Sequence, residues 1–179
     1  KAITGIIATV LMGTVIACGA VKHGALTDTA AVRGADEGEG EYYLDDEAIA
    51  LASRAATTQT MDEAIQTAFT LTNNQRTAKG LAGFVPNTAL ADAAKVRAQE
   101  IVSTFSHTRP DGSQFWTVNS DVMWGENLAK LYNSGDTVVA AWMASPTHAA
   151  NILAGDYASM GIGIYQNGND WYWAQEFGR

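Results

Sequence analysis

Apolar residues recur at helical spacing along residues 60–80, and both ends of this stretch carry residues that start or stop helices. Thr60 and Glu63 have the spacing of a capping box, in which each side chain satisfies a backbone N–H of the first turn. Gly80 follows the apolar stripe, where a left-handed residue ends many helices. The pattern therefore predicts a helix between Thr60 and Gly80.

A second helical stripe begins after Asn87, a residue type that caps helix N-termini, and continues to Phe105. Residues 109–112 read Arg-Pro-Asp-Gly, which is turn composition. The second helix is therefore expected to end at Ser106 and His107, immediately before this turn.

Two shorter helices are expected further along the chain. Residues 136–143 are rich in alanine and valine and include Trp142. Ser145 and Pro146 then provide an N-cap and a first-turn proline, which predict a last helix that continues to Leu153.

Strand patterns occupy the remaining segments of the second half. Residues 124–131 predict a short strand, and residues 160–166 and 170–177 flank an Asn-Gly-Asn turn, which is a strong hairpin signal. The hairpin strands are apolar on both faces, and Gly161 and Gly163 leave room for another element to approach. We therefore expect an α+β fold, a three-layer α-β-α sandwich around a small central antiparallel sheet.

The N-terminal third has a different composition. Residues 1–18 carry one lysine, an apolar run and small residues before Cys18, which is typical of a signal peptide or a lipoprotein signal with Cys18 as the lipidated residue. The alternative is a core strand that buries Cys18. Residues 19–59 are acidic and rich in glycine and alanine, which predicts a tether with one short helix in residues 43–56. The folded domain is expected to span residues 60–179.

The charge balance narrows the range of partners. The chain has 19 acidic and 11 basic residues and a net charge of −8, which excludes nucleic acid because phosphate binding needs clustered lysine and arginine. We expect membrane contact only through the N-terminal signal or lipid. The expected location is extracellular or at the cell surface.

Three polar residues stand among glycines, prolines and aromatic residues in the second half: His107, Glu126 and His148. Burying such groups requires partners. Two neutral imidazoles and a carboxylate form a workable ligand set for Zn²⁺, with an open position for water or substrate. The same groups also suit a hydrogen-bonded network without metal, in which the carboxylate fixes an imidazole tautomer.

A serine-hydrolase mechanism would use Ser145 as the nucleophile, a histidine as the base and Glu126 to orient it. Two features of the sequence disfavour this mechanism. As an N-cap, Ser145 would direct its hydroxyl at backbone donors, and the chain has no Gly-x-Ser-x-Gly motif.

The segment from about Ala64 to Gly178 resembles bacterial members of the CAP superfamily, also called SCP-like proteins (cysteine-rich secretory proteins, antigen 5 and pathogenesis-related 1). The matching positions are Asn73 and Arg76, Leu90, Ala93 and Ala94, Phe105 and His107, Gly125 to Ala129, Trp142, Ser145, Pro146 and His148, Asn151 to Leu153, Gly161 and Gly163, and Trp173, Gln175, Phe177 and Gly178. They occur in the family's order and cover about two thirds of the chain.

The resemblance implies an α-β-α sandwich with a central cavity, in which two histidines and two acidic residues can hold a divalent metal. His107, Glu126 and His148 match three of these positions, and the fourth acidic position falls on Ser145. We therefore expect a ligand-binding cavity that includes these four residues and Asn127. Its cofactor would be at most a weakly bound Zn²⁺ or Mg²⁺.

Together these features predict a secreted or lipid-anchored binding module whose ligand is a lipid, a peptide or a protein. A metal-dependent, peptidase-like hydrolase that uses the same cavity is the first alternative. A structural surface or adhesion module is the second. The incomplete tetrad favours binding over catalysis, and the sequence leaves the question of enzymatic activity open.

Overall fold

The computed structural model describes residues 27–33, 42–43 and 59–179 of the 179-residue chain. Cys18, the apolar segment before it and most of the helix expected in residues 43–56 lie outside the described residues. The described elements are β1 (Thr27–Val32), β2 (Tyr42–Tyr43), α2 (Met61–Ala78), β3 (Val85–Pro86), α3 (Thr88–Glu100), the 3-10 helix η1 (Phe115–Val118), β4 (Gly125–Lys130), α4 (Gly135–Ala144), α5 (Pro146–Ile152), β5 (Ser159–Asn167) and β6 (Asp170–Gly178).

The capping interactions predicted at the start of the two long helices are confirmed. The Thr60 side chain accepts the N–H of Glu63, and the Glu63 carboxylate accepts the N–H of Thr60, which completes the capping box of α2. Asn87 Oδ1 accepts from the N–H groups of Ala89 and Leu90 at the start of α3. Side-chain caps therefore fix where both long helices begin.

The sheet has the strand order β2-β1-β4-β6-β5-β3. β5 and β6 form the predicted hairpin around Gly168, which adopts a positive φ of 63°. β4 pairs antiparallel with β6 from Gly125–Phe177 to Lys130–Tyr172. The two-residue β3 is parallel to β5, so the sheet is mixed, where the sequence predicted an antiparallel one.

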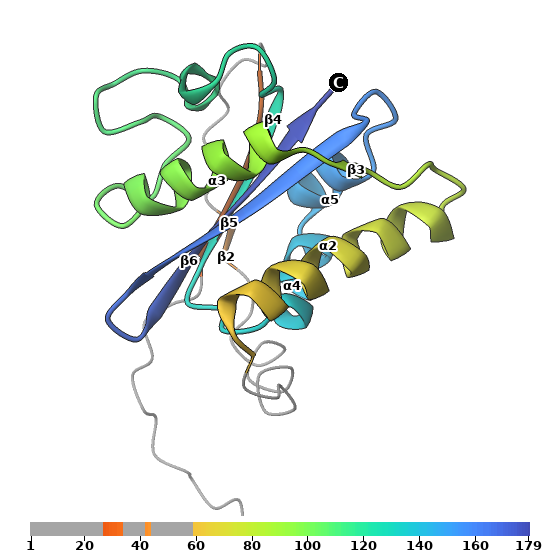
Figure 1. Cartoon of the computed structure of the whole chain (residues 1–179), viewed down its shortest axis with the longest axis horizontal. Coiled ribbons are helices and arrows are strands. Elements are labelled where there is room, and N and C mark those ends of the chain that lie inside the picture. The colour runs from red at the N-terminus through yellow and green to blue at the C-terminus, as the bar shows by residue number, and fades with distance from the viewer. Residues whose placement is uncertain (1–26, 34–41, 44–58) are drawn as a thin grey trace, which may run out of the picture.

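The elements form three layers, with α3 on one side of the sheet and α2, α4 and α5 on the other (Figure 1). α3 lies directly on β5 because Gly161 and Gly163 have no side chains. A Cβ at either glycine would overlap the α3 backbone, at Ala91 or Lys95. The close approach expected at these glycines is therefore filled by a helix.

The main hydrophobic core lies between the sheet and the layer of α2, α4 and α5. Trp142, Trp173 and Phe177 are fully buried there. The two tryptophan rings meet edge to face with their centroids 6.4 Å apart, a favoured aromatic geometry.

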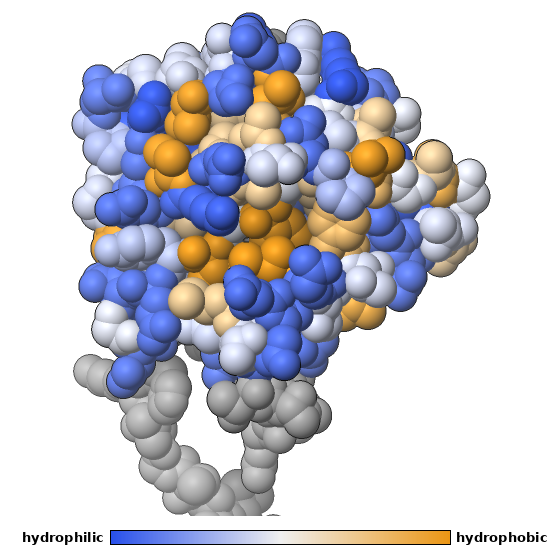
Figure 2. Space-filling view, viewed as in Figure 1, coloured by the Kyte–Doolittle hydropathy of each residue, from blue (hydrophilic) through white to orange (hydrophobic). Residues whose placement is uncertain are grey.

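Apolar side chains also gather between polar ones on the face shown in Figure 2. Among the described residues, the most exposed large hydrophobic side chains are Val85, Val96 and Tyr165. They belong to β3, α3 and β5, so the exposed apolar positions are shared by several elements. No helix in the described part of the chain is long and apolar enough to cross a bilayer.

Two predicted boundaries are wrong. α3 ends at Glu100, before Ser106, because the Ser106 carbonyl accepts a hydrogen bond from Arg97, so the chain folds back after Glu100. The composition of residues 19–59 predicts a tether, but β1 and β2 within this stretch pair in the sheet. The stretch lacks an apolar alternation, so only the backbone pairing with β4 reveals β1 as a strand.

Candidate functional site

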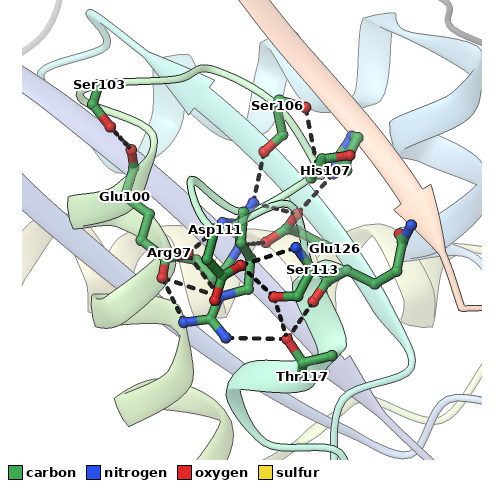
Figure 3. Close-up of polar contacts among 12 residues, drawn as sticks. Arg97, Glu100, Ser103, Ser106, His107, Asp111, Ser113, Thr117 and Glu126 are labelled. Carbon is green, nitrogen blue, oxygen red and sulfur yellow. Dashed lines mark hydrogen bonds and ion pairs between the residues drawn. The ribbon is translucent and has the colours of Figure 1, made fainter.

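A buried arginine organises the site on the α3 side of the sheet (Figure 3). Arg97 is fully buried, and its Nε donates to Glu126 Oε2 at 2.7 Å while its Nη2 donates to Glu126 Oε1 at 3.2 Å. Its Nη1 donates to Glu100 Oε2 at 2.6 Å, and Nη2 also reaches the Ser106 carbonyl at 2.7 Å. The guanidinium thus joins β4, α3 and the loop after α3.

The ion pairs continue from Arg97 toward the surface. Arg109 Nη2 donates to Glu100 Oε1 at 2.7 Å, and its Nη1 donates to Thr117 Oγ1 at 3.0 Å. The hydrogen bond to Glu100 raises the pKa of Arg109. Burial opposes the charge of Arg97, but Glu126 and Glu100 outweigh it and raise the Arg97 pKa above its ordinary value. Positive and negative groups therefore alternate from the core to the surface.

His107 is another partly exposed residue, and it is bonded to Glu126. Its Nδ1 lies 2.7 Å from Glu126 Oε1, and its side chain is 19% exposed while that of Glu126 is fully buried. Burial alone would raise the pKa of Glu126, but Arg97 and His107 together hold it below the ordinary value of 4.5. In the neutral imidazole whose Nδ1–H donates a hydrogen bond to the Glu126 carboxylate, the lone pair lies on Nε2. That nitrogen has no hydrogen-bond partner among the described residues.

Glu176 is a site residue that the sequence reasoning missed. It lies opposite Glu126 on β6, and both side chains are fully buried. Burial, and then the charge of Glu126, raise the pKa of Glu176 well above 4.5, which favours its protonated form. The signal that could have found it is strand register, because residues paired across a sheet share a face. We call Arg97, Glu100, Arg109, His107, Glu126 and Glu176 the charged group.

The remaining predicted residues form a second set, which contains no carboxylate and no arginine. His148 Nδ1 lies 2.7 Å from Ser145 Oγ, and Asn127 Nδ2 donates to the His148 carbonyl at 3.3 Å. Asn127 also donates to Gln175 Oε1 at 2.9 Å and accepts from Asn151 Nδ2 at 3.0 Å. Thr72 accepts a hydrogen bond from Gln175. We call the following residues the amide group: Thr72, Asn127, Ser145, His148, Asn151 and Gln175.

The structure therefore divides the predicted site into two parts. It brings His107 to Glu126, and it brings Ser145 and Asn127 to His148. Ser145 occupies the N-cap position of α5 without a side-chain bond to the backbone, which corrects the expectation that capping uses its hydroxyl. Its side chain is nevertheless almost fully buried, and the carboxylate of Glu126 is engaged by Arg97 and His107.

The arrangement of these side chains also bears on whether the expected metal ion can bind. Within the described part of the chain, no three His, Cys, Asp or Glu side chains lie in an arrangement that could hold a metal ion. Both oxygens of Glu126 already accept from the Arg97 guanidinium, whose positive charge opposes a nearby cation. The three-ligand set expected from His107, Glu126 and His148 is not assembled in this arrangement.

Comparison with known proteins places this geometry in a family. The model of the cysteine-rich secretory protein (CAP) family matches residues 69–177. The chain belongs to the CAP family. The match begins within α2 and ends in β6, so it includes β4 and the whole charged group, whereas β1 and β2 precede it.

Relatives of this CAP chain are found in bacteria. An uncharacterized protein of Bacillus subtilis, YkwD, is 32% identical over 114 residues, which is 60% of this chain and 44% of that protein. The chain thus spans less than half of the length of this curated relative.

Two solved structures share the fold. One is an extracellular SCP-domain protein of Bacillus anthracis, with a TM-score of 0.59, 24% identity, and coverage of 76% of this chain and 51% of that one. The other is an outer surface protein of Borrelia burgdorferi, with a TM-score of 0.60, 20% identity, and coverage of 69% of this chain and 97% of that one.

Proposed function

We propose that this CAP-domain chain acts outside the cytoplasm, secreted or anchored at the cell surface through Cys18, as a binding module for a lipid, peptide or protein ligand. Two proteins with the same fold are described as an extracellular protein and an outer surface protein, which supports this location. The net charge of −8 and the lack of a basic cluster in the sequence support a ligand other than nucleic acid.

One observation carries the binding role. Glu126 and the buried Arg97 hold the His107 ring, while Nε2 of the ring has no partner among the described residues. The His107 side chain is 19% exposed, but Nε2 itself is buried, and a buried acceptor without a partner favours a ligand that brings a donor. Because the ring is already held in place, little freedom is lost on binding. The Phe115 ring, 6.2 Å from the His107 ring, provides an apolar neighbour.

The test compares ligand binding by the wild-type chain and His107→Asn. Asparagine keeps a donor for Glu126 but removes Nε2. We expect one class among phosphatidylglycerol vesicles and a library of synthetic heptapeptides to bind the wild type and to bind His107→Asn about tenfold more weakly. Ser103→Ala, an exposed change in the same segment, is the control. Equal binding by wild type and His107→Asn across both classes contradicts the proposal.

A hydrolase is the second candidate, favoured by the same histidine–carboxylate pair. A carboxylate that orients an imidazole is the arrangement used by general bases. If the chain is a metal-dependent hydrolase, Zn²⁺ should bind stoichiometrically in calorimetry and peptide hydrolysis should follow metal occupancy. If the module is purely structural, His107→Asn should change the unfolding midpoint and no binding assay.

A further inference from the structure

The outer edge of β4 is covered by a strand from outside the family segment. β1 pairs antiparallel with β4 over five residue pairs, from Asp28–Ala129 to Val32–Gly125, whereas the family match begins only at residue 69. Without β1, the edge of β4 would present unpaired backbone groups, which readily accept an added strand. Extended peptides bind to many domains by adding a strand in this way.

A side chain from another element also holds the added strand. Asn151, on α5 and almost fully buried, donates its Nδ2 to the Ala31 carbonyl at 3.1 Å. The same amide is fixed by the Glu126 carbonyl at 3.2 Å and by Asn127 Oδ1 at 3.0 Å. A buried amide that binds a backbone carbonyl of the neighbouring strand recognises an extended main chain, whatever its side chains are.

The contacts at the end of β1 involve the side chains of Arg33 and Ala31 as well as the backbone. Arg33 donates its backbone N–H to the Trp124 carbonyl at 2.7 Å and its Nη1 to the Ser120 carbonyl at 2.8 Å. Its guanidinium carbon lies 5.0 Å from the Trp124 ring centre and 5.8 Å from that of Trp116, within the range of cation–π attraction. Two residues earlier, the small side chain of Ala31 packs on the cluster that contains Phe115.

The bound strand runs directly beside the candidate site. Ala31 is the register partner of Glu126, the carboxylate that orients His107, and β1 passes this pair in Figure 3. We propose that the outer edge of β4 is a binding site for an extended peptide with arginine two residues after a small residue, and that β1 occupies this site in cis. The inference rests on the proposed function, because it names the ligand class that reaches His107.

The test uses the full chain and a fluorescein-labelled synthetic peptide with the sequence of residues 27–33, measured by fluorescence anisotropy. Two variants weaken the cis strand. Ala31→Pro removes a backbone N–H that points at β4, since residues 31 and 33 share that direction. Arg33→Ala keeps the backbone and removes the guanidinium. Lys95→Ala, exposed on α3, is the matched control.

Both β1 variants should bind the peptide at least about tenfold more tightly than wild type and Lys95→Ala, because a filled edge lowers the fraction of chains able to bind. A peptide with alanine in place of arginine should bind about fivefold more weakly to Ala31→Pro. Equal peptide binding by wild type and variants, or equal binding of the two peptides, overturns the proposal. If Ala31→Pro does not fold, Arg33→Ala alone decides the first comparison.

Two further measurements identify the occupant and separate this inference from the proposed function. A wild-type dimer in light scattering that Arg33→Ala converts to monomer would make a second copy the occupant and overturn the proposal. If the peptide binds selectively and His107→Asn does not change that binding, the binding site at the β4 edge is supported and the proposed role of His107 is overturned. If the chain binds vesicles but no peptide, and His107→Asn abolishes the vesicle binding, the role of His107 in ligand binding is supported and the peptide site at the β4 edge is overturned.

Discussion

The two faces of β4 carry polar groups of opposite character, one residue apart. Glu126 points toward α3 and belongs to the charged group, whereas Asn127 points toward α5 and belongs to the amide group. Both side chains are fully buried, and each has a partner opposite it on β6, Glu176 or Gln175. The strand pleat alone separates them, because successive side chains point to opposite faces.

The difference lies in what each group requires to be buried. An amide donates and accepts without charge, so Asn127, Asn151 and Gln175 satisfy one another. A carboxylate needs a counter-charge, which the buried Arg97 supplies to Glu126. Only the charged group continues outward, through Arg109 and His107, each about one-fifth exposed. The α3 face therefore combines a fixed interior with a partly exposed histidine whose buried Nε2 has no partner among the described residues.

Removing the Arg97 guanidinium should give the largest loss of stability and the clearest difference between the two faces of β4. Arg97→Met leaves the fully buried Glu126 without its main partner, and breaking a buried ion pair from one side costs about 3–5 kcal/mol. Glu100 also loses one of its two arginine partners. The free energy of unfolding in urea measures this loss. Lys95→Met on the same helix is the control, because the Lys95–Asp92 pair is 62% and 68% exposed and should change stability by less than about 1 kcal/mol. Similar losses for the two variants would contradict a central role of Arg97.

The amide group should respond more weakly. Asn127→Ala removes a partner from Gln175 and Asn151, and leaving buried amides unsatisfied costs about 1–3 kcal/mol. Because Gln175 and Asn151, the side chains that lose a partner, do not titrate, the loss should be the same at pH 5 and pH 8. Asn74→Ala, exposed on α2, serves as the reference. A loss as large as that of Arg97→Met, or one that varies with pH, would show that the faces are not independent.

The elements of the domain were largely predictable, because local chemistry decides them. Thr60 and Asn87 cap their helices through their own side chains, and Gly168 allows the hairpin turn. The close packing at Gly161 and Gly163 also followed from sequence, since only a residue without a side chain permits it. These features depend on neighbours within a few residues, which a single sequence displays.

The division of the site was not predictable from residue types. The sequence identified His107, Glu126 and His148 as one set, but their pairing depends on the pleat of β4 and on the place of α5. Glu176 escaped notice because its role comes from register with Glu126, 50 positions away in the chain. β1 escaped for a similar reason, since its pairing with β4 is long-range.

A third expected effect is a change of stability with pH on the charged face. The pKa of Glu176 is raised in the folded chain by burial and by Glu126, so above its ordinary value of 4.5 the unfolded chain releases a proton that the folded chain keeps. Stability from this group is full below pH 4.5 and falls as the pH rises toward the folded pKa, by up to about 1.4 kcal/mol per pH unit. Glu176→Gln lacks the titrating group, so its stability relative to wild type should increase between pH 5 and pH 8.

Glu63→Gln provides a control of opposite sign for this measurement. The pKa of Glu63 is lowered by hydrogen bonds from the backbone and side chain of Thr60, so its contribution is present above pH 4.5 and is lost as the pH falls below that value. Urea unfolding of wild type and both variants at pH 4, 5, 6, 7 and 8 separates the two cases. If Glu176→Gln runs parallel to wild type throughout, Glu176 ionises with Glu126 in the folded state. The α3 face then holds two buried negative charges beside Arg97. The two faces of β4 would in that case differ by two buried charges and not by the single Arg97–Glu126 ion pair.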